Sequence, residues 1–331
     1  MLKEDDKLRK HRLKLRGEEA MGKQQLLFII SQKSGVPQHY KKIEALIRAH
    51  FKPEEARIQI TEKKHSVFEY AKAWAEKFGD RGTVYICGGD GAINEAASAL
   101  YGTPTQMGVI PGGTANDFAK TLYGKRPFTE DIVQKLLDQA HQPKHQAIDL
   151  LRLNQEKVVV NSVSLGFDNL VLKQAYENIK KWPRIGSRAY PLAVVQSLFK
   201  DRSYPVEITL ETAAGKTLTY RDDMVLSVFA NGGFYGGGFN PAPNAVIDDG
   251  QGDFLYAKAM NLFAFLPLIL RYEKGTHLNH PKVVSQRFKK ARLKSTTGQP
   301  IHGNCDGDLF QATEVEVELL PGALPFSRLS L

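Results

Sequence analysis

The chain has 331 residues, roughly the length of two domains and enough to bury a core without disulfides or a structural metal. Apolar residues make up 42% and charged residues 24%, an ordinary globular composition that excludes disordered and collagen-like chains. Two cysteines, Cys87 and Cys305, exclude a disulfide framework and a four-cysteine zinc site, and they indicate a reducing, cytoplasmic setting. The longest apolar run, Leu262–Leu270, is too short to cross a bilayer.

The formal net charge of +9 is unevenly distributed along the chain. The first 25 residues hold eight basic and five acidic residues, so we expect residues 1–24 to form a basic, mobile tail rather than a signal peptide. Met21 as the natural start is an open alternative. Between Arg271 and Lys294, eight basic residues accompany one acidic residue, which predicts either a surface for anionic lipid or a solvated strand face. No nucleic-acid-binding signature accompanies them, so we expect no nucleic acid partner.

Residues 25–148 alternate between short apolar runs and segments of helical period, which predicts an α/β nucleotide-binding domain with parallel strands. The expected strands are Gln25–Ser31, Arg57–Ile60, Thr83–Cys87 and Met107–Ile110. Four helices are expected: one that begins at Pro37, then Val67–Phe78, Ala92–Leu100, and one that ends at Leu122.

Residues 149–331 contain many short β-like runs, which predicts a β-rich domain that takes the substrate. The expected strands are Lys157–Val163, Val206–Glu211, Met224–Ala230, Asp253–Ala259, Lys282–Phe288 and Glu314–Leu320. Helices are expected at Asn169–Lys181, Ala189–Phe199 and Asn261–Tyr272.

The segment Gly88-Gly89-Asp90-Gly91-Ala92-Ile93-Asn94-Glu95 stands between an expected strand and an expected helix. Its glycines let the backbone approach an anion closely, and the start of the helix presents unpaired N–H groups. We therefore interpret it as a phosphate cradle, in which Asp90 binds a metal ion carried by the phosphates and Asn94 binds phosphate or ribose. A turn that merely permits tight packing is the alternative.

A second turn of this kind, Pro111–Phe118, follows the next expected strand. Ligands of open α/β sheets bind beyond the carboxyl ends of the strands, so both turns should face one cleft. Neither turn contains the Gly-x4-Gly-Lys-Ser/Thr or the Gly-x-Gly-x-x-Gly signature, which excludes a P-loop and a dinucleotide fingerprint.

The two turns resemble those of the diacylglycerol-kinase-type lipid kinases, a family of bacterial lipid kinases related to sphingosine kinases. Gly88–Glu95 is similar to the family's Gly-Gly-Asp-Gly-Thr-x-Asn-Glu block, and Pro111–Ala119 to its Pro-x-Gly-Thr-x-Asn-Asp-Phe-Ala block. The resemblance implies a Rossmann-like domain of the NAD kinase and diacylglycerol kinase type, a C-terminal β-sandwich, and Mg²⁺-dependent transfer of the γ-phosphate of ATP to a lipid hydroxyl. The ATP-binding residues it implies are Ser34, Thr61, Gly88, Gly89, Asp90, Gly91, Ala92, Ile93, Asn94, Thr114, Asn116 and Asp117.

The segment Pro241–Gly250 is similar to the family's Pro-x-Ala-x-x-x-Asp-Gly loop. The resemblance implies a structural Mg²⁺ ion held by the carboxylate of Asp249 and the backbone carbonyls of Val246 and Gln251, a set of oxygen ligands that suits magnesium. An ordinary Asp-Gly turn is the alternative.

The triplet Asp306-Gly307-Asp308 is similar to the family's Asp-Gly-Glu. The resemblance implies that Asp308 is the catalytic base, with Asp306 as the second candidate and Asp90 as a further catalytic carboxylate. A carboxylate suits this reaction because the lipid hydroxyl must be oriented and deprotonated while magnesium neutralises the developing charge.

Three positions depart from the family pattern: Ala92 replaces a threonine, Ser31-Gln32 replaces Asn-Pro, and Asp308 replaces a glutamate. A catalytically weak lipid or nucleotide sensor is therefore one alternative, and an NAD kinase-like enzyme is another. The expected partners are ATP and a lipid substrate at the inner face of the membrane, and a homodimer is compatible with the sequence. The sequence does not identify the lipid.

Overall fold

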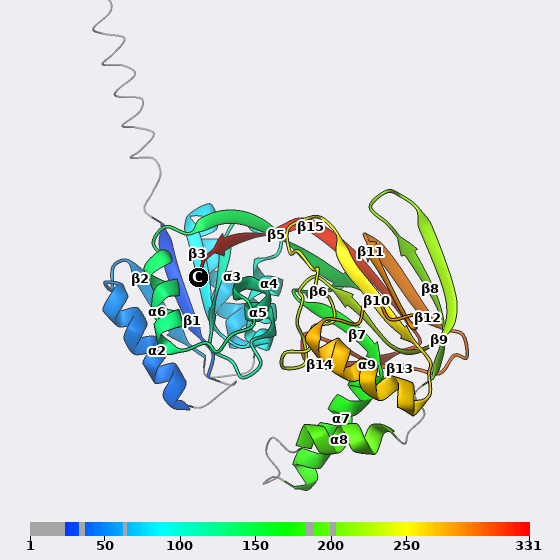
Figure 1. Ribbon diagram of the computed structural model, residues 1–331. Helices are drawn as coiled ribbons and strands as arrows, with labels where there is room; N and C mark the ends of the chain where they lie inside the picture. The colour runs from blue at the N-terminus through cyan, green and yellow to red at the C-terminus, as the bar shows by residue number, and fades with distance from the viewer. Residues whose placement is uncertain (1–23, 33–36, 62–64, 183–188, 199–202) are drawn as a thin grey trace, which may run out of the picture.

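The computed structural model describes residues 24–32, 37–61, 65–182, 189–198 and 203–331, which form two adjacent bodies (Figure 1). The first body is a parallel sheet with strand order β2-β1-β3-β4 and helices on both faces. Its elements are β1 (Gln25–Ile30), α2 (Pro37–His50), β2 (Ala56–Ile60), α3 (Ser66–Phe78), β3 (Gly82–Gly88), α4 (Asp90–Leu100), β4 (Gln106–Pro111), α5 (Asp117–Tyr123) and α6 (Glu130–Gln139). The predicted parallel α/β fold of this half is confirmed.

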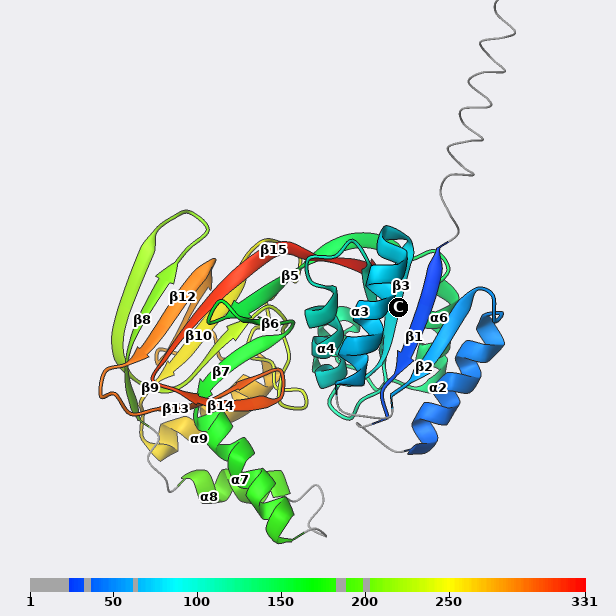
Figure 2. The ribbon, with the colours of Figure 1, turned by 180° about the vertical axis from the view of Figure 1, so that it is seen from behind.

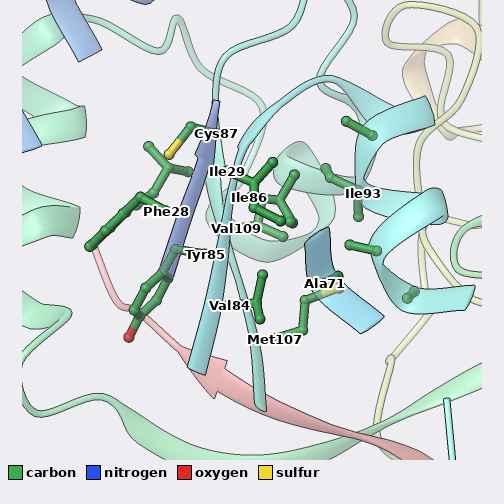
Figure 3. Packing of buried hydrophobic residues seen from close by; sticks show 14 of the residues in the cluster. Phe28, Ile29, Ala71, Val84, Tyr85, Ile86, Cys87, Ile93, Met107 and Val109 are labelled. Carbon is green, nitrogen blue, oxygen red and sulfur yellow. The ribbon is translucent and has the colours of Figure 1, made fainter. Parts of the chain in front are cut away.

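Nearly every residue of β3 and β4 is buried. Successive side chains of a strand point to opposite sides, so both faces of the sheet are covered. Phe28 and Tyr85 are register partners on β1 and β3, and their rings stack with centroids 5.0 Å apart. Figure 3 shows them on one side of the sheet, with Ile29 and Ile86 on the other. Each fully buried side chain of this size contributes about 1.5–3 kcal/mol, so this core holds the sheet that carries both glycine turns.

Two long strands join the bodies (Figure 2). β5 (Lys144–Leu153) and β15 (Glu314–Arg328) pair antiparallel along most of their length, with a register shift between Leu320 and Leu324. Near its end β15 also pairs with β4, through Phe326 and Met107. The domain boundary expected after residue 148 therefore falls inside β5, and the end of the chain returns to the first body.

The second body is a β-sandwich-like arrangement around its own apolar cluster. Its other strands are β6 (Lys157–Val159), β7 (Ser162–Gly166), β8 (Tyr204–Glu211), β9 (Thr217–Ala230), β10 (Gly252–Lys258), β11 (Val283–Phe288), β12 (Lys290–Ser295), β13 (Ile301–Cys305) and β14 (Asp308–Ala312). The prediction of a single strand over Lys157–Val163 is wrong. The strand is interrupted at Val160 and Asn161, whose N–H groups donate to Asp306 instead of to a neighbouring strand.

Three helices gather at one end of the second body: α7 (Phe167–Lys181), α8 (Ala189–Leu198) and α9 (Leu262–Lys274) (Figure 1). They share a small apolar cluster, in which the rings of Phe167 and Phe265 meet edge to face with centroids 5.0 Å apart. In the described part of the chain, no helix is both long and apolar enough to span a membrane.

Candidate active site

The two glycine turns pack directly against each other where β3 and β4 end. The amide of Gly112 donates to the carbonyl of Gly88 at 3.1 Å. A Cβ on Gly113 would lie 2.3 Å from the Cα of Gly89, so only glycine permits this approach. The prediction that both turns lie together at one edge of the sheet is therefore confirmed.

Asn116 shapes the second turn from within. It adopts a left-handed conformation with φ 54°, and its side-chain amide exchanges two hydrogen bonds with the backbone of Gly113, both 2.8 Å long. Asn94 has a related role, because its Oδ1 accepts a hydrogen bond from the amide of Val160 at 3.2 Å. Asn116 thus braces its own turn, whereas Asn94 links α4 to the residue after β6.

Two aspartates follow the turns, each at the start of a helix. Asp90 Oδ1 accepts from the amide of Phe118 at 2.9 Å. Asp117 accepts from Lys120 Nζ at 2.9 Å and from the amide of Gly237 at 2.8 Å. Loss of water around Asp90, reinforced by the negative charge of Asp117, raises the pKa of its carboxyl. A cation at this point would relieve that repulsion.

The turn between β13 and β14 brings the other two predicted catalytic aspartates to the same place. Asp306 accepts hydrogen bonds from the amides of Val160, Asn161 and Ser162 at 2.8–3.1 Å. Loss of water outweighs these three bonds, and the charge of Asp90 adds to it, so the pKa of Asp306 rises to about 6. Because its oxygens are taken up by the backbone, Asp306 supports the loop.

Asp308 is the more accessible of the two carboxylates. Its side chain is 75% exposed, and its Oδ2 forms an ion pair with Lys157 Nζ at 2.6 Å. A partner on a flexible lysine stem can be displaced by a substrate, whereas three backbone amides cannot. The arrangement therefore favours Asp308 over Asp306 as a base.

One cleft of about 610 Å³ joins these groups. Its polar end is lined by Gly89, Asp90, Gly91, Thr114 and Asp117, and Asp306 and Asp308 line it as well. Its apolar side is formed by Phe167, Val171, Leu172, Tyr176, Val194, Leu226, Phe265, Ile269 and Tyr272, mostly from α7, α8 and α9. A ligand here would meet the glycine turns, several carboxylates and an apolar wall within one cleft.

Some predicted nucleotide-binding residues lie elsewhere. The side chains of Ala92 and Ile93 are buried, and both amides donate to the carbonyl of Gly89, so they close the first turn of α4. Thr61 is buried after β2, where its Oγ1 accepts from the amide of Gln32 at 3.2 Å. Gly88 ends β3 behind the cleft. Ser34 lies outside the described residues.

The structure adds a polar group that the sequence reasoning missed. Asp168 lines the cleft and accepts from the hydroxyl of Tyr235 at 3.0 Å, and Tyr272 donates to that hydroxyl at 3.2 Å. Loss of water raises the pKa of Asp168 to about 6. Its signal was an aspartate in the first turn of a helix that follows a strand ending in glycine, as is also true of Asp90.

Asp168→Asn is expected to flatten the pH dependence of stability. Because the folded state holds the Asp168 proton more tightly than the unfolded state, this group makes the free energy of unfolding fall as pH rises from about 4 to about 6. Asparagine cannot titrate. The free energy of unfolding of the variant, minus that of the unmodified protein, should therefore rise over that pH interval by on the order of 1–3 kcal/mol. Urea unfolding at both ends of the interval measures this, and a constant difference would contradict it.

A positively charged side chain, that of Arg287 on β11, reaches the expected magnesium loop. Arg287 Nη1 lies 2.7 Å from Asp249 Oδ2, while Asp249 Oδ1 accepts from the amide of Gln251 at 3.0 Å. The side chain of Val246 is exposed. Both oxygens of Asp249 are engaged and Arg287 would repel a divalent cation, so these residues fit a guanidinium better than Mg²⁺.

Arg287→Gln is expected to lower the melting temperature and to make it respond to Mg²⁺. The half-exposed ion pair contributes about 1 kcal/mol, and its loss frees a carboxylate oxygen for a metal. Thermal unfolding without nucleotide, with Mg²⁺ or a chelator, measures both effects. Arg292→Gln, which removes the exposed pair with Glu314, is the matched control. If Mg²⁺ stabilises the unmodified protein and Asp249→Asn removes that response, the loop holds magnesium after all.

Two family models cover nearly the whole described chain. Residues 25–153 match the diacylglycerol kinase catalytic domain, and residues 161–327 match the YegS C-terminal NAD kinase beta sandwich-like domain. The fold and the glycine-turn cleft thus define a kinase of the two-domain type.

Curated relatives agree with this class. The chain is 30% identical over 250 residues to a probable lipid kinase YegS-like of Shewanella frigidimarina, and 31% identical over 252 residues to a diacylglycerol kinase of Mycobacterium tuberculosis. Each match covers 74% of this chain and 76% of the relative. The chain belongs to the family of diacylglycerol-kinase-type lipid kinases, as its turns predicted.

Solved structures share the fold. A putative diacylglycerol kinase from Bacillus anthracis str. Sterne has a TM-score of 0.70 at 22% sequence identity, over 92% of this chain and 97% of that one. The predicted combination of an α/β domain with a C-terminal β-sandwich is confirmed.

Proposed function

We propose that the protein transfers the γ-phosphate of ATP to the hydroxyl of a diacylglycerol or a similar lipid. The observation that carries this proposal is the single cleft that runs from the glycine turns, past Asp308, to the apolar walls of α7 and α9. A nucleotide suits the first end because glycine backbone and helix starts bind phosphate. An acyl chain suits the other end, and similarity to proteins named diacylglycerol kinase supports that substrate class.

In this reaction the lipid hydroxyl oxygen forms a bond to the γ-phosphorus, and the bond from that phosphorus to the β-phosphate oxygen breaks to release ADP. Asp308 takes the hydroxyl proton as the new bond forms. Asp90 would hold a Mg²⁺ ion carried by the nucleotide, since such ions take one or two protein carboxylates and substrate phosphates, and that ion would neutralise charge on the phosphates. Asp117, whose two oxygens accept from Lys120 and from the amide of Gly237, lies beside it. Asp168, with Tyr235, would bind a second polar group of the lipid.

The working place of the enzyme would be the inner face of the membrane, where its lipid substrate lies. A homodimer stays a prediction. Domain boundaries at residues 24/25 and 148/149 also stay a proposal, with β5 and β15 shared between the halves.

The test is incubation of the protein with γ-labelled ATP and Mg²⁺, with a total lipid extract in one reaction and NAD in another. Label in a lipid supports the proposal and identifies the substrate. Label on NAD supports the NAD kinase-like alternative, although Asn94-Glu95 directly after the first turn favours the lipid reaction. ATP binding without transfer to either supports the sensor.

A further inference from the structure

The basic stretch on β12 is neutralised within the sheet. Lys290 Nζ lies 3.0 Å from Glu316, and Arg292 Nε lies 2.6 Å from Glu314. Lys294 is a register partner of glutamates on both neighbouring strands. This stretch fits the solvated strand face rather than the surface for anionic lipid.

A different surface presents unpartnered apolar side chains. Phe263 is 88% exposed, Leu266 41% and Leu270 61%, and their spacing of three and four residues puts them on one face of α9. Phe265 and Tyr272 lie on the opposite face, where they are buried and line the cleft. α9 is thus apolar both toward the cleft and toward solvent.

Exposed apolar side chains also stand on α7, beside the cleft. On α7, Tyr176 is 50% exposed and Ile179 45%, three residues apart on one face. Tyr176 also lines the cleft, so it borders both the channel and the outer surface. We call these five exposed residues, Tyr176, Ile179, Phe263, Leu266 and Leu270, the α7–α9 surface.

The charge around the α7–α9 surface is mainly positive. Its exposed charged neighbours on the two helices are Lys173, Lys180, Lys181, Arg271 and Lys274, against Glu177 and Glu273. Among the ion pairs that the described residues form, none involves these five basic side chains, in contrast to β12. Lys181 Nζ lies 4.8 Å from the centroid of the Trp182 ring. Exposed apolar side chains with basic ones nearby that form no ion pair are typical of helices that lie in the interface of an anionic membrane.

We propose that the α7–α9 surface docks on an anionic phospholipid bilayer and brings the mouth of the cleft to the lipid. The inference rests on the proposed function for its purpose, because a substrate with long acyl chains must leave the bilayer to reach Asp308. Docking here gives it a path along Tyr176 into the apolar channel without crossing water.

The test is co-sedimentation of the whole protein with vesicles of phosphatidylcholine alone or mixed with phosphatidylglycerol, without nucleotide. The double variant Phe263→Asp, Leu270→Asp should lower the partition coefficient onto mixed vesicles at least tenfold. Lys180→Ala with Lys274→Ala should weaken binding to mixed vesicles but leave binding to phosphatidylcholine unchanged. The matched control is Leu331→Asp, which changes an exposed leucine at the last position of the chain, and this variant should bind normally.

Equal binding by the double variant and the unmodified protein would overturn the proposal. A double variant that instead changes the oligomeric state in light scattering would make the α7–α9 surface an interface between two copies of the chain. Vesicle binding requires no catalysis, so docking can stand even where no phosphate is transferred. Phosphorylation of a short-chain diacylglycerol in detergent should remain normal in the double variant, which separates docking from chemistry.

Discussion

Asp308→Asn is expected to reduce lipid phosphorylation about 10²–10⁴-fold, the usual contribution of a positioned general base. Asparagine keeps the size of the side chain but cannot accept the hydroxyl proton. Asp308 is largely exposed, and among the described residues its carboxylate pairs with Lys157 alone, so the fold should be unaffected. Initial rates at saturating ATP, together with thermal unfolding, measure both.

Two companion variants sharpen this result. Asp308→Glu restores the longer side chain of the family pattern and should retain activity. Asp306→Asn should instead lower stability, because three backbone amides lose a charged acceptor and each such bond contributes about 1.5–3 kcal/mol. Near-normal activity of Asp308→Asn would exclude Asp308 as the base.

Gly113→Ala is expected to disrupt nucleotide binding. Its new methyl group would lie 2.3 Å from the Cα and 3.0 Å from the amide nitrogen of Gly89, and these backbone atoms have little room to move. The two turns must separate, which should cost about 1–3 kcal/mol of stability and lower ATP affinity at least tenfold. Equilibrium binding of a fluorescent ATP analogue and thermal unfolding measure these effects.

Gly91→Ala provides the control for this prediction. A Cβ at Gly91 would meet nothing within 4 Å, so the fold should tolerate it. A loss of ATP affinity in Gly91→Ala at normal stability would then report contact with the nucleotide itself. Normal stability and ATP affinity in Gly113→Ala would show that the contact between the turns is not needed.

The sequence predicted the first body well because its signals are local. The buried strands β3 and β4 end in glycine turns, and the predicted helices repeat their apolar positions at helical spacing, so these elements can be located without knowing their neighbours. Parallel strands also place their carboxyl ends at one edge, which is why the meeting of Gly89 and Gly113 could be predicted.

The second body depends on pairings between residues far apart in the sequence. β15 continues to Arg328 although Pro321 and Gly322 interrupt its pattern, because β5 is there to pair with it beyond the register shift. Nothing in the local sequence indicates the interruption of the strand after β6, because it depends on a distant residue: Asp306 accepts hydrogen bonds from three amides there. The contact between Arg287 and Asp249 likewise joins distant segments, so the local motif could not predict it, and the magnesium loop implied by the resemblance stays a prediction.

We propose that one cleft holds the nucleotide at its glycine turns and a lipid chain along α7 and α9. Leu172→Trp tests it most directly, because Leu172 lines the apolar side and is far along the chain from both turns. The measurement is phosphate transfer from γ-labelled ATP to diacylglycerol, with ATP affinity determined in parallel. We expect kcat/KM for the lipid to fall at least tenfold while ATP affinity stays unchanged. Normal lipid phosphorylation by this variant would contradict the account.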